Sequence, residues 1–503
     1  MNLMTVEELI ALFVDDGITS TGQNEANVLL KLRACNAERD FNRQYILLGE
    51  LVVLVRQYMA IAGNESKNWP AALLDNIHGY VISRMGDNQE KVPEKIHFVW
   101  IGGAITPTVM NYVNVWAMIN SSYEINIWYD SNLLCLKKLS DIFGQMAGER
   151  YSKEEDRDNW ADAMFRLRQQ FTDFVLKRHP DFEDMTRAIN EFLVSIGKNV
   201  VLQDDMIWSG PEMQENIIIR DLHVEGILEH ELYETYMKEA IQTQNFAALS
   251  DIARLLVLKN QGGIYIDVDM LPQINPKLIS RFRAYDMEIQ RPLIQAVMRA
   301  TEYIPDYRTN ELEACADGES MLQAVRDMQG DEPVMMELGD ISCHPMAYRV
   351  FCQDRGLINQ MVAAHPESMM INMLLRQIGQ NYSTMESYFG PPPFAGRSLQ
   401  EVTNERGQIW CRIQKGRIAD LLERCVGYYK TGLIREYRST LAITGPTIYS
   451  SVIFDVTKFE SGPCSQTKNK VDSGSEEYRC FEIPFSKLTV YTEEELRSSW
   501  AVR

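Results

Sequence analysis

The chain has 503 residues and a formal net charge of −20, because 70 Asp and Glu outnumber 50 Lys and Arg. With 45% hydrophobic and 24% charged residues, its composition is that of a globular protein with a large buried core, long enough for about three domains. The acidity argues against nucleic acid as a partner, because phosphate binding depends on clustered Lys and Arg. No uncharged apolar run of about 18 residues occurs, so no transmembrane helix is predicted.

Missing motifs exclude several further classes of protein. The sequence contains no G-x-x-x-x-G-K-[ST] or G-x-G-x-x-G phosphate-binding motif, no G-x-S-x-G and no H-E-x-x-H. Its nine Cys are scattered without a C-x-x-C pair, which argues against a zinc or thioredoxin-like site. Whether Cys464 and Cys480 pair is left open. Glu7 and Glu8 stand where a secretory signal would be positively charged, so no signal peptide is predicted.

The first 92 residues are predicted to form a helical bundle, as a domain of their own. Thr5 and Glu8 have the spacing of a capping box that opens a first helix. Apolar residues at helical spacing predict three more helices, over residues 24–37, 41–62 and 70–85.

From residue 93 onward the pattern predicts an α/β domain that extends to residue 503. A strand over residues 95–101, a helix over 108–119 and a strand over 124–129 form a βαβ unit, which indicates a parallel sheet. Ligands of such sheets bind at the carboxyl ends of the strands, where Trp100, Gly102, Asp130 and Asn132 are expected.

The rest of this domain alternates helical and extended segments. Residues 140–240 are charged and poor in Gly, and are predicted to be a helical insertion. A helix over 245–260 should end at Gly262 and lead into a strand over 264–271. Further on, short strands are predicted over 441–444 and 487–491, and a helix over 493–500.

The sharpest local feature is Asp267-Val268-Asp269, near the end of the strand predicted over 264–271. Side chains two residues apart share one face of a strand, so the two carboxylates would point into one crevice. Two like charges beside a core need a positive partner, and Mg²⁺ or Mn²⁺ prefers such oxygen ligands. The alternative is a strand-end pair exposed to water. Asp156-Arg157-Asp158 has the same spacing in a polar stretch, where a solvated helix face is expected.

Two other groups of polar residues have ordinary structural explanations. Asp251 and Arg254 are three residues apart and therefore neighbours on one helix face. They suit the binding of hydroxyl groups, but the residues alone favour a surface ion pair of little energetic value. Near the end of the chain, Glu495 fits a capping box with Thr492, and Trp500 suits a packing anchor.

Together, these motifs resemble the glucosyltransferase domain of the large clostridial cytotoxins. They occur in one order: IHFVWIGG at 96–103, YDSN at 129–132, AALSDIARLLVLKNQGGIYIDVDMLP at 247–272, YIPDY at 303–307, GLINQ at 356–360 and SSW at 498–500. The N-terminal region matches only as a helical bundle of similar length. The resemblance implies a GT-A fold with a mixed, mostly parallel sheet. It also implies Mn²⁺-dependent transfer of glucose from UDP-glucose, with retention of configuration, to a switch-region threonine of host Rho or Ras GTPases.

The resemblance also implies roles for individual residues. Trp100 would stack on uracil, and the residues beside it would be Val99, Phe246 and Ser250. Asp251 and Arg254 would hold sugar hydroxyls, in contrast to the surface pair favoured above. The remaining contacts to the ribose and the donor sugar would come from Tyr265, Asp267 and Asn359. Asp269 would bind Mn²⁺, with Mg²⁺ as a substitute, and Glu495 and Ser498 would reach the metal from the C-terminal segment. Trp500 would contact the β-phosphate and the glycosidic oxygen.

Other residues affect the expected donor sugar, the expected acceptor protein and the expected binding to membranes. Bulky Ile358 and Gln360 flank Asn359, and in the resembled family such neighbours favour glucose over N-acetylglucosamine. Thr447 stands where relatives carry a Glu linked to GTPase recognition, which leaves the acceptor less certain than the donor. Residues 1–90 carry 7 Lys and Arg against 12 Asp and Glu, so their net charge predicts no attraction to an anionic host membrane. Whether the tip of the helical bundle still contacts the membrane is left open.

We expect a monomer of bacterial origin, secreted or delivered, that acts in the host cytosol, including the inner face of the plasma membrane. The alternatives are the same enzyme with UDP-N-acetylglucosamine, with a Tyr acceptor or with a non-GTPase acceptor, and a non-catalytic module that docks on a GTPase. Which GTPase is modified, how the chain is delivered and whether it is part of a larger toxin are left open.

Overall fold

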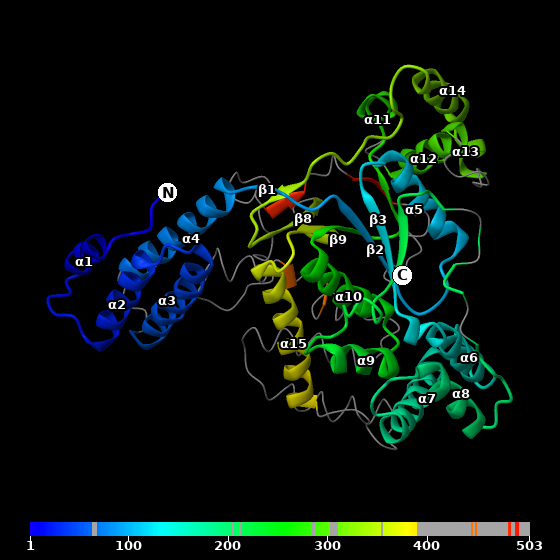
Figure 1. Cartoon of the computed structure of the whole chain (residues 1–503), viewed down its shortest axis with the longest axis horizontal. Helices are drawn as coiled ribbons and strands as arrows, with labels where there is room; N and C mark the ends of the chain where they lie inside the picture. The colour runs from blue at the N-terminus through cyan, green and yellow to red at the C-terminus, as the bar shows by residue number, and fades with distance from the viewer. Residues whose placement is uncertain are drawn as a thin grey trace.

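The computed structural model describes residues 1–62, 68–203, 206–208, 210, 213–283, 287–301, 310–353, 356–389, 444–445, 448–449, 481–483 and 488–491. A central sheet is surrounded by three groups of helices that project from it in different directions (Figure 1). The sheet and the helices directly on its two faces position the candidate site.

Four helices form the first group, on the left in Figure 1, close to the predicted ranges: α1 (Val6–Asp15), α2 (Gln23–Ala37), α3 (Phe41–Ala62) and α4 (Trp69–Asp87). The capping box of α1 is confirmed: the Thr5 hydroxyl accepts the Glu8 amide, and the Glu8 carboxylate accepts the Thr5 amide at 2.7 Å. Inside the group the Phe13 ring meets the edge of the fully buried Trp69, with ring centres 4.9 Å apart.

The main sheet has seven strands in the order β10-β8-β9-β5-β2-β3-β4. Their bounds are β2 (Lys95–Trp100), β3 (Glu124–Tyr129), β4 (Ile217–Asp221), β5 (Gly263–Ile266), β8 (Tyr348–Gln353), β9 (Gly356–Ala364) and β10 (Glu482–Ile483). Strand β2 runs parallel to β3 and β5, β3 to β4, and β10 to β8, whereas β9 is antiparallel to both of its neighbours. The sheet is therefore mixed and mostly parallel, and the predicted βαβ unit is confirmed.

Each face of this sheet is covered by helices. On one face, α5 (Pro107–Ile119) packs Val113 and Trp116 against apolar side chains of β2, β3 and β5. On the other face, α10 (Phe246–Gln261) and α15 (Met369–Phe389) bury side chains such as Leu256 and Leu374 against the sheet, with α9 (Tyr233–Gln242) beside α10. Because both faces are covered, the strands are apolar on both sides.

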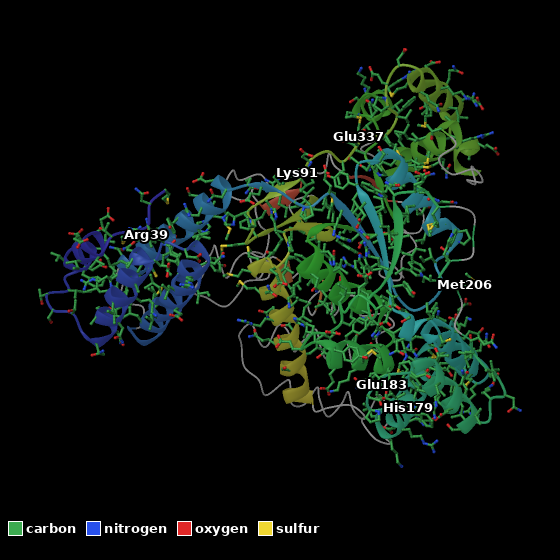
Figure 2. All side chains as sticks on the ribbon, viewed as in Figure 1. Arg39, Lys91, His179, Glu183, Met206 and Glu337 are labelled. Atoms are coloured by element: carbon green, nitrogen blue, oxygen red, sulfur yellow. The ribbon has the colours of Figure 1, made fainter. Side chains whose placement is uncertain are left out.

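The other two helical groups extend from the edges of this core (Figure 1). One follows the short helix η1 (Ser131–Leu133) and contains α6 (Leu136–Gly148), α7 (Arg157–Arg178) and α8 (Met185–Ser195). The other contains α11 (Pro276–Phe282), α12 (Met287–Thr301), α13 (Asn310–Ala314) and α14 (Gly318–Gln329). Figure 2 places Lys91 where the N-terminal helices meet the sheet, and there its ammonium group pairs with Glu94 at 2.6 Å and Asp340 at 2.8 Å.

Two expectations about strands need correction. The prediction of a single strand over 264–271 is wrong, because β5 ends at Ile266 and a separate strand β6 (Met270–Pro272) follows. Residues 267–269 between them form a turn, in which the Met270 amide donates to the Asp267 carbonyl at 3.1 Å. The reason is a change of partner, because β6 leaves the main sheet and pairs with β11 (Leu488–Tyr491). Within the region predicted to be helical, β4 adds an edge strand to the sheet.

Several predicted features lie outside the described residues: most of the strand over 441–444, the helix over 493–500, and Cys464 and Cys480. Thr444 is described and lies in a turn. A second small pairing, β1 (Glu90–Lys91) with β7 (Ser342–Cys343), joins the start of the sheet domain to its later part. In the described part of the chain, no helix is both long and apolar enough to cross a membrane.

Candidate active site

Four chain segments meet at one edge of the sheet. Strands β2, β3 and β5 are parallel, so Trp100, Asp130 and Asp267 follow one another along the same edge. Strand β9 is antiparallel to β5 and therefore begins at this edge, where the Asp267 amide donates to the Gln360 carbonyl at 2.8 Å. Asn359, predicted from the sequence to lie near the donor sugar, is thus brought next to Asp267.

The pair Asp251 and Arg254 lies on α10, and both residues are buried, with 1% and 3% of their surface exposed. The surface ion pair favoured by the residues alone is therefore wrong. Asn245 caps α10 by accepting the Ala248 amide, and Gly262 ends the helix with a positive φ of 63°. This local geometry turns the polar side of α10 toward the sheet, where β9 and residue 444 cover it.

Arg254 is the centre of the site. Its guanidinium donates to the Asp251 carboxylate at 3.1 Å, to the Asp267 carboxylate at 3.2 Å and to the Asn359 carbonyl at 2.8 Å. It also lies over the Tyr265 ring, 4.2 Å from the ring centre. A buried cation with this many partners holds strand β5, strand β9 and helix α10 in one arrangement.

Asp251 accepts hydrogen bonds on both of its carboxylate oxygens. Oδ1 accepts from the Asn359 amide at 2.8 Å, and Oδ2 accepts from the Thr444 hydroxyl at 2.8 Å. Burial raises the pKa of Asp251, and Arg254, Thr444 and Asn359 oppose this rise by stabilising the charged form. Sequence reasoning missed Thr444, and no local signal marks it, because its contact spans 193 positions of the chain.

Asp267 occupies the end of β5 and keeps about a fifth of its side chain exposed, at 22%. The Tyr265 hydroxyl, from the buried residue two positions earlier, donates to its carboxylate at 2.5 Å. Burial raises the pKa of Asp267 to about 7, with Arg254 opposing the rise and Asp269 adding to it. The two acidic residues of the D-x-D motif therefore interact electrostatically, and a turn, not the predicted strand, holds them.

A group of apolar side chains, from Val99, Trp100 and Phe246, lies at the end of β2 and the start of α10. Val99 is buried, and the half-buried Trp100 donates its indole N–H to the Ala104 carbonyl at 3.1 Å. The Phe246 ring, at the start of α10, lies directly on Gly102, where a Cβ atom would be only 2.2 Å from the ring. The Ser250 hydroxyl lies one helical turn further on and accepts from Arg254 at 3.4 Å. The predicted members of the nucleotide side therefore lie next to the predicted members of the sugar side.

Asp130 and Asn132, also expected at this edge, have structural partners. Asp130 accepts from the Tyr236 hydroxyl at 2.9 Å and from the Asn132 amide at 2.9 Å, and it pairs with His223 at 3.0 Å. The Asn132 side chain donates to the Phe182 carbonyl at 2.5 Å and accepts the Met185 amide at 2.9 Å. These bonds fix the start of the α6–α8 group to the sheet.

The fit of the site to a divalent cation rests on Asp269. It is a partly exposed carboxylate at the sheet edge, beside Asp267, and such an oxygen suits Mn²⁺ or Mg²⁺. The residues described include no group of three or more His, Cys, Asp or Glu with metal-binding geometry. The other predicted metal contacts, Glu495 and Ser498, lie outside the described residues, as does Trp500.

Comparisons with known proteins agree with this geometry. The model of the TcdA/TcdB catalytic glycosyltransferase domain matches residues 94–390. Toxin B of Clostridioides difficile is 26% identical over 499 residues, which cover 92% of this chain and 20% of the toxin. Cytotoxin-L of Paraclostridium sordellii is 25% identical over 447 residues, which cover 84% of this chain and 19% of that protein. The chain spans about a fifth of the length of these curated relatives.

Two solved structures share the fold. The catalytic domain of alpha-toxin from Clostridium novyi superposes with a TM-score of 0.80 at 19% identity, covering 100% of this chain and 98% of that domain. The UDP-bound glycosyltransferase domain of the YGT toxin gives a TM-score of 0.54 at 18% identity, covering 81% and 82% of the two chains. From the family match over residues 94–390 and the shared fold, we conclude that this chain belongs to the TcdA/TcdB catalytic glycosyltransferase domain family.

Proposed function

We propose that this chain transfers glucose from UDP-glucose to a threonine hydroxyl of a host Rho or Ras GTPase, in a Mn²⁺-dependent reaction that retains the sugar configuration. The observation that carries the proposal is the buried network of Asp251, Arg254, Asn359 and Asp267 at the carboxyl edge of the sheet. Ligands of open α/β sheets bind at this edge. A paired carboxylate and guanidinium provide an acceptor and donors for sugar hydroxyls.

The network suits a sugar because its polar groups are shielded from water. Asp251 and Arg254 are almost fully buried, and hydrogen bonds are electrostatically stronger in such a low-dielectric environment. A sugar hydroxyl can take the place of the Thr444 or Asn359 donor on the Asp251 carboxylate, since each occupies one carboxylate oxygen. In this proposal Arg254 favours the charged form of both carboxylates while the sugar binds.

The uridine half of the donor is assigned to the apolar side chains at the end of β2. Trp100 offers a ring for stacking on uracil, Val99 precedes it on β2, and the Phe246 ring lies against Gly102 two residues later. The glycosyltransferase domain of the YGT toxin, which has the same fold, has been solved with UDP bound, and this supports a uridine nucleotide as part of the donor. Stacking of a base on an aromatic side chain contributes about 1–3 kcal/mol.

We assign the metal to Asp269, with Glu495 and Ser498 from the C-terminal segment. When bound, Mn²⁺ supplies positive charge that stabilises the diphosphate leaving group. The Trp500 indole N–H would donate to the glycosidic oxygen or the β-phosphate, where negative charge also develops. Arg254 holds the Asp267 carboxylate and Tyr265 donates to it, so Asp267 is positioned to orient the donor and not to attack the sugar.

At the level of domains, we propose that residues 1–92 form a helical docking domain and residues 93–503 the GT-A transferase domain, with residues 140–240 as its helical insertion. We also propose that the protein is delivered by a bacterium and acts in the host cytosol. The division at residue 92 agrees with a family match that begins at residue 94, and delivery is proposed because Toxin B and Cytotoxin-L, which are several times longer than this chain, are toxins.

The test is the intact mass of a panel of Rho and Ras GTPases after incubation with this protein, UDP-glucose and Mn²⁺. A gain of one hexose on one GTPase, absent with the Asp267→Asn/Asp269→Asn variant, is the expected result. Release of UDP without modification of any GTPase would keep the transferase and reject the acceptor. If neither UDP release nor a mass gain occurs, the proposed reaction is wrong. Parallel incubation with UDP-N-acetylglucosamine tests the donor.

A further inference from the structure

Tyr449 is a buried tyrosine whose hydroxyl has no hydrogen-bond partner in the structure as far as it is described. The residue is fully buried, at 0% exposure, and its phenol oxygen is among the few buried polar atoms without a partner. Its neighbour Tyr348, on β8, is equally buried and meets the Tyr449 ring edge-on, with ring centres 5.4 Å apart. The Tyr348 hydroxyl is satisfied, because it donates to the Tyr449 carbonyl at 2.8 Å.

The position of Tyr449 is tied to the sugar side of the candidate site. Five residues earlier, the Thr444 hydroxyl donates to Asp251, and the Ile448 amide donates to the Gly445 carbonyl at 3.2 Å. Tyr449 therefore follows the same turn that contacts the Asp251 carboxylate. The charges of Arg254, Asp251 and Asp267 all influence the pKa of Tyr449, in agreement with this position beside the sugar side. Burial raises the pKa of Tyr449, so the phenol is neutral and retains its proton for donation.

An unsatisfied buried hydroxyl is unfavourable for stability, because the group has lost its bonds to water and gained none in the protein. Phenylalanine would fill the same space without this cost. Tyr348 differs in this respect, because its hydroxyl donates to a backbone carbonyl, whereas no described residue binds the Tyr449 hydroxyl. A group of this kind next to a ligand site is explained when the ligand provides the missing partner.

We propose that Tyr449 is a further residue of the donor-sugar site, whose hydroxyl donates a hydrogen bond to a hydroxyl oxygen of the glucosyl group held by Asp251 and Arg254. The inference rests on the proposed function and extends it by one sugar contact. We assign the sugar and not the base as its partner, because Tyr449 follows the turn whose Thr444 hydroxyl binds Asp251, whereas Trp100 and Phe246 are assigned to the nucleotide side. The Tyr449 hydroxyl then raises the affinity for UDP-glucose but not the affinity for UDP.

The experiment compares Tyr449→Phe with Tyr348→Phe in the full chain with Mn²⁺. Both variants remove one buried phenol oxygen, but among the described residues the Tyr348 oxygen has a partner and the Tyr449 oxygen has none. The affinities for UDP-glucose and for UDP are measured by calorimetry, UDP release is measured by steady-state kinetics, and melting temperatures are measured without ligand.

For Tyr449→Phe we expect a melting temperature equal to or above that of the wild type, unchanged affinity for UDP, and affinity for UDP-glucose reduced about 3- to 10-fold, the value of one neutral hydrogen bond. For Tyr348→Phe we expect a lower melting temperature and an unchanged ratio of UDP-glucose to UDP affinity. A Tyr449→Phe variant that melts lower and keeps the wild-type ratio would overturn the inference, because the hydroxyl would then have a structural partner such as a buried water. If the wild type binds neither UDP nor UDP-glucose, the proposed function fails and the inference fails with it.

Discussion

Arg254 is buried between the carboxylates of Asp251, which is also buried, and Asp267, of which about a fifth is exposed, so its charge has a structural role. Removing one partner of a buried ion pair leaves uncompensated charge and costs about 3–5 kcal/mol. We therefore expect Arg254→Met to lower the free energy of unfolding by about this amount at pH 7, as measured by urea denaturation. Arg254→Lys should cost less, because it keeps the charge but loses the planar fork.

The matched control is Arg166→Met on α7. Arg166 pairs with Asp162 at 2.8 Å, but 59% of its side chain is exposed. An exposed pair of this kind contributes about 1 kcal/mol or less. Equal effects of Arg166→Met and Arg254→Met would show that burial does not determine the role of the Arg254 pair.

Because His97 on β2 is buried, we expect the protein to lose stability in acid. The ring is fully buried, accepts the Trp128 indole N–H at 3.0 Å and contacts the Gly262 carbonyl at 2.8 Å, which fixes a neutral tautomer. Burial lowers its pKa to about 3, while the Gly262 carbonyl opposes the shift. The unfolded chain takes up this proton near its ordinary pKa of about 6.5, and the folded chain does not. The stabilising contribution is therefore complete above about pH 6.5 and is lost as the pH falls toward 3.

The measurement is the free energy of unfolding in urea at several pH values between 7.5 and 4.5. Below pH 6, the free energy of unfolding of the wild type should fall by about 1.4 kcal/mol more per pH unit than that of a His97→Gln variant, because one extra proton binds when the wild type unfolds. The variant will be less stable at neutral pH, so the slopes and not the absolute values are compared. Parallel pH profiles would contradict the assignment of the proton to His97.

The proposed metal site can be tested by comparing the two D-x-D sequences of the chain, at residues 267–269 and 156–158. Asp269→Asn should reduce Mn²⁺-dependent UDP release by at least about 100-fold, because stabilisation by a metal ion is worth several kcal/mol. Asp156→Asn changes the first residue of the other D-x-D spacing, at the N-terminal end of α7, and should leave UDP release unchanged. A similar loss in both variants, or in neither, would reject Asp269 as a metal ligand.

At the scale of elements, the contact between the end of β2 and the start of α10 depends on the absence of a side chain at residue 102. Gly102 has φ of 102°, and its Cβ would collide with the Phe246 ring at 2.2 Å, whereas the nearest atom to a Cβ at Gly103 is 3.7 Å away. We expect Gly102→Ala to cost at least about 1–3 kcal/mol for the backbone conformation alone. It should also weaken UDP affinity by displacing Phe246. Gly103→Ala should leave UDP affinity, measured by calorimetry, close to that of the wild type.

The elements also show which parts of the fold are encoded locally. The start of α1 was predictable because Thr5 and Glu8 satisfy each other within one turn. The predicted strand over 264–271 failed because β6 takes a partner near residue 490, which no local pattern reveals. The sequence pattern placed Asp267 and Asp269 on one strand, whereas in the structure they lie in the turn between β5 and β6. Asp251 and Arg254 looked like a surface pair because the Asn359 and Thr444 contacts that accompany their burial come from distant segments.

At the scale of the whole molecule, the N-terminal helices meet the sheet domain through a small aromatic contact. Phe41 on α3 lies edge-on to His344 at 5.6 Å and under the Arg84 guanidinium at 5.0 Å, and Tyr45 approaches the Met373 sulfur at 4.0 Å. Truncating a buried Phe to Ala costs about 3–5 kcal/mol. We expect Phe41→Ala to separate an early unfolding transition of α1–α4 from that of the sheet domain in calorimetry. Phe174→Ala, in the α7 aromatic cluster, should not. A single unchanged transition in Phe41→Ala would show that the two parts unfold together through other contacts.

The hydrogen bonds of the Asp251 carboxylate have a consequence for the order in which the chain folds. Its two oxygens are held by residues 108 and 193 positions away along the chain. Contacts between such distant segments form late, because closing a long loop is entropically unfavourable until other structure brings its ends together. Helices α1–α4 and the strands β2 and β3 require only short loops. In refolding from urea, the far-ultraviolet signal of the helices should therefore return before donor binding does, and catalytic competence should be the last property that the chain acquires.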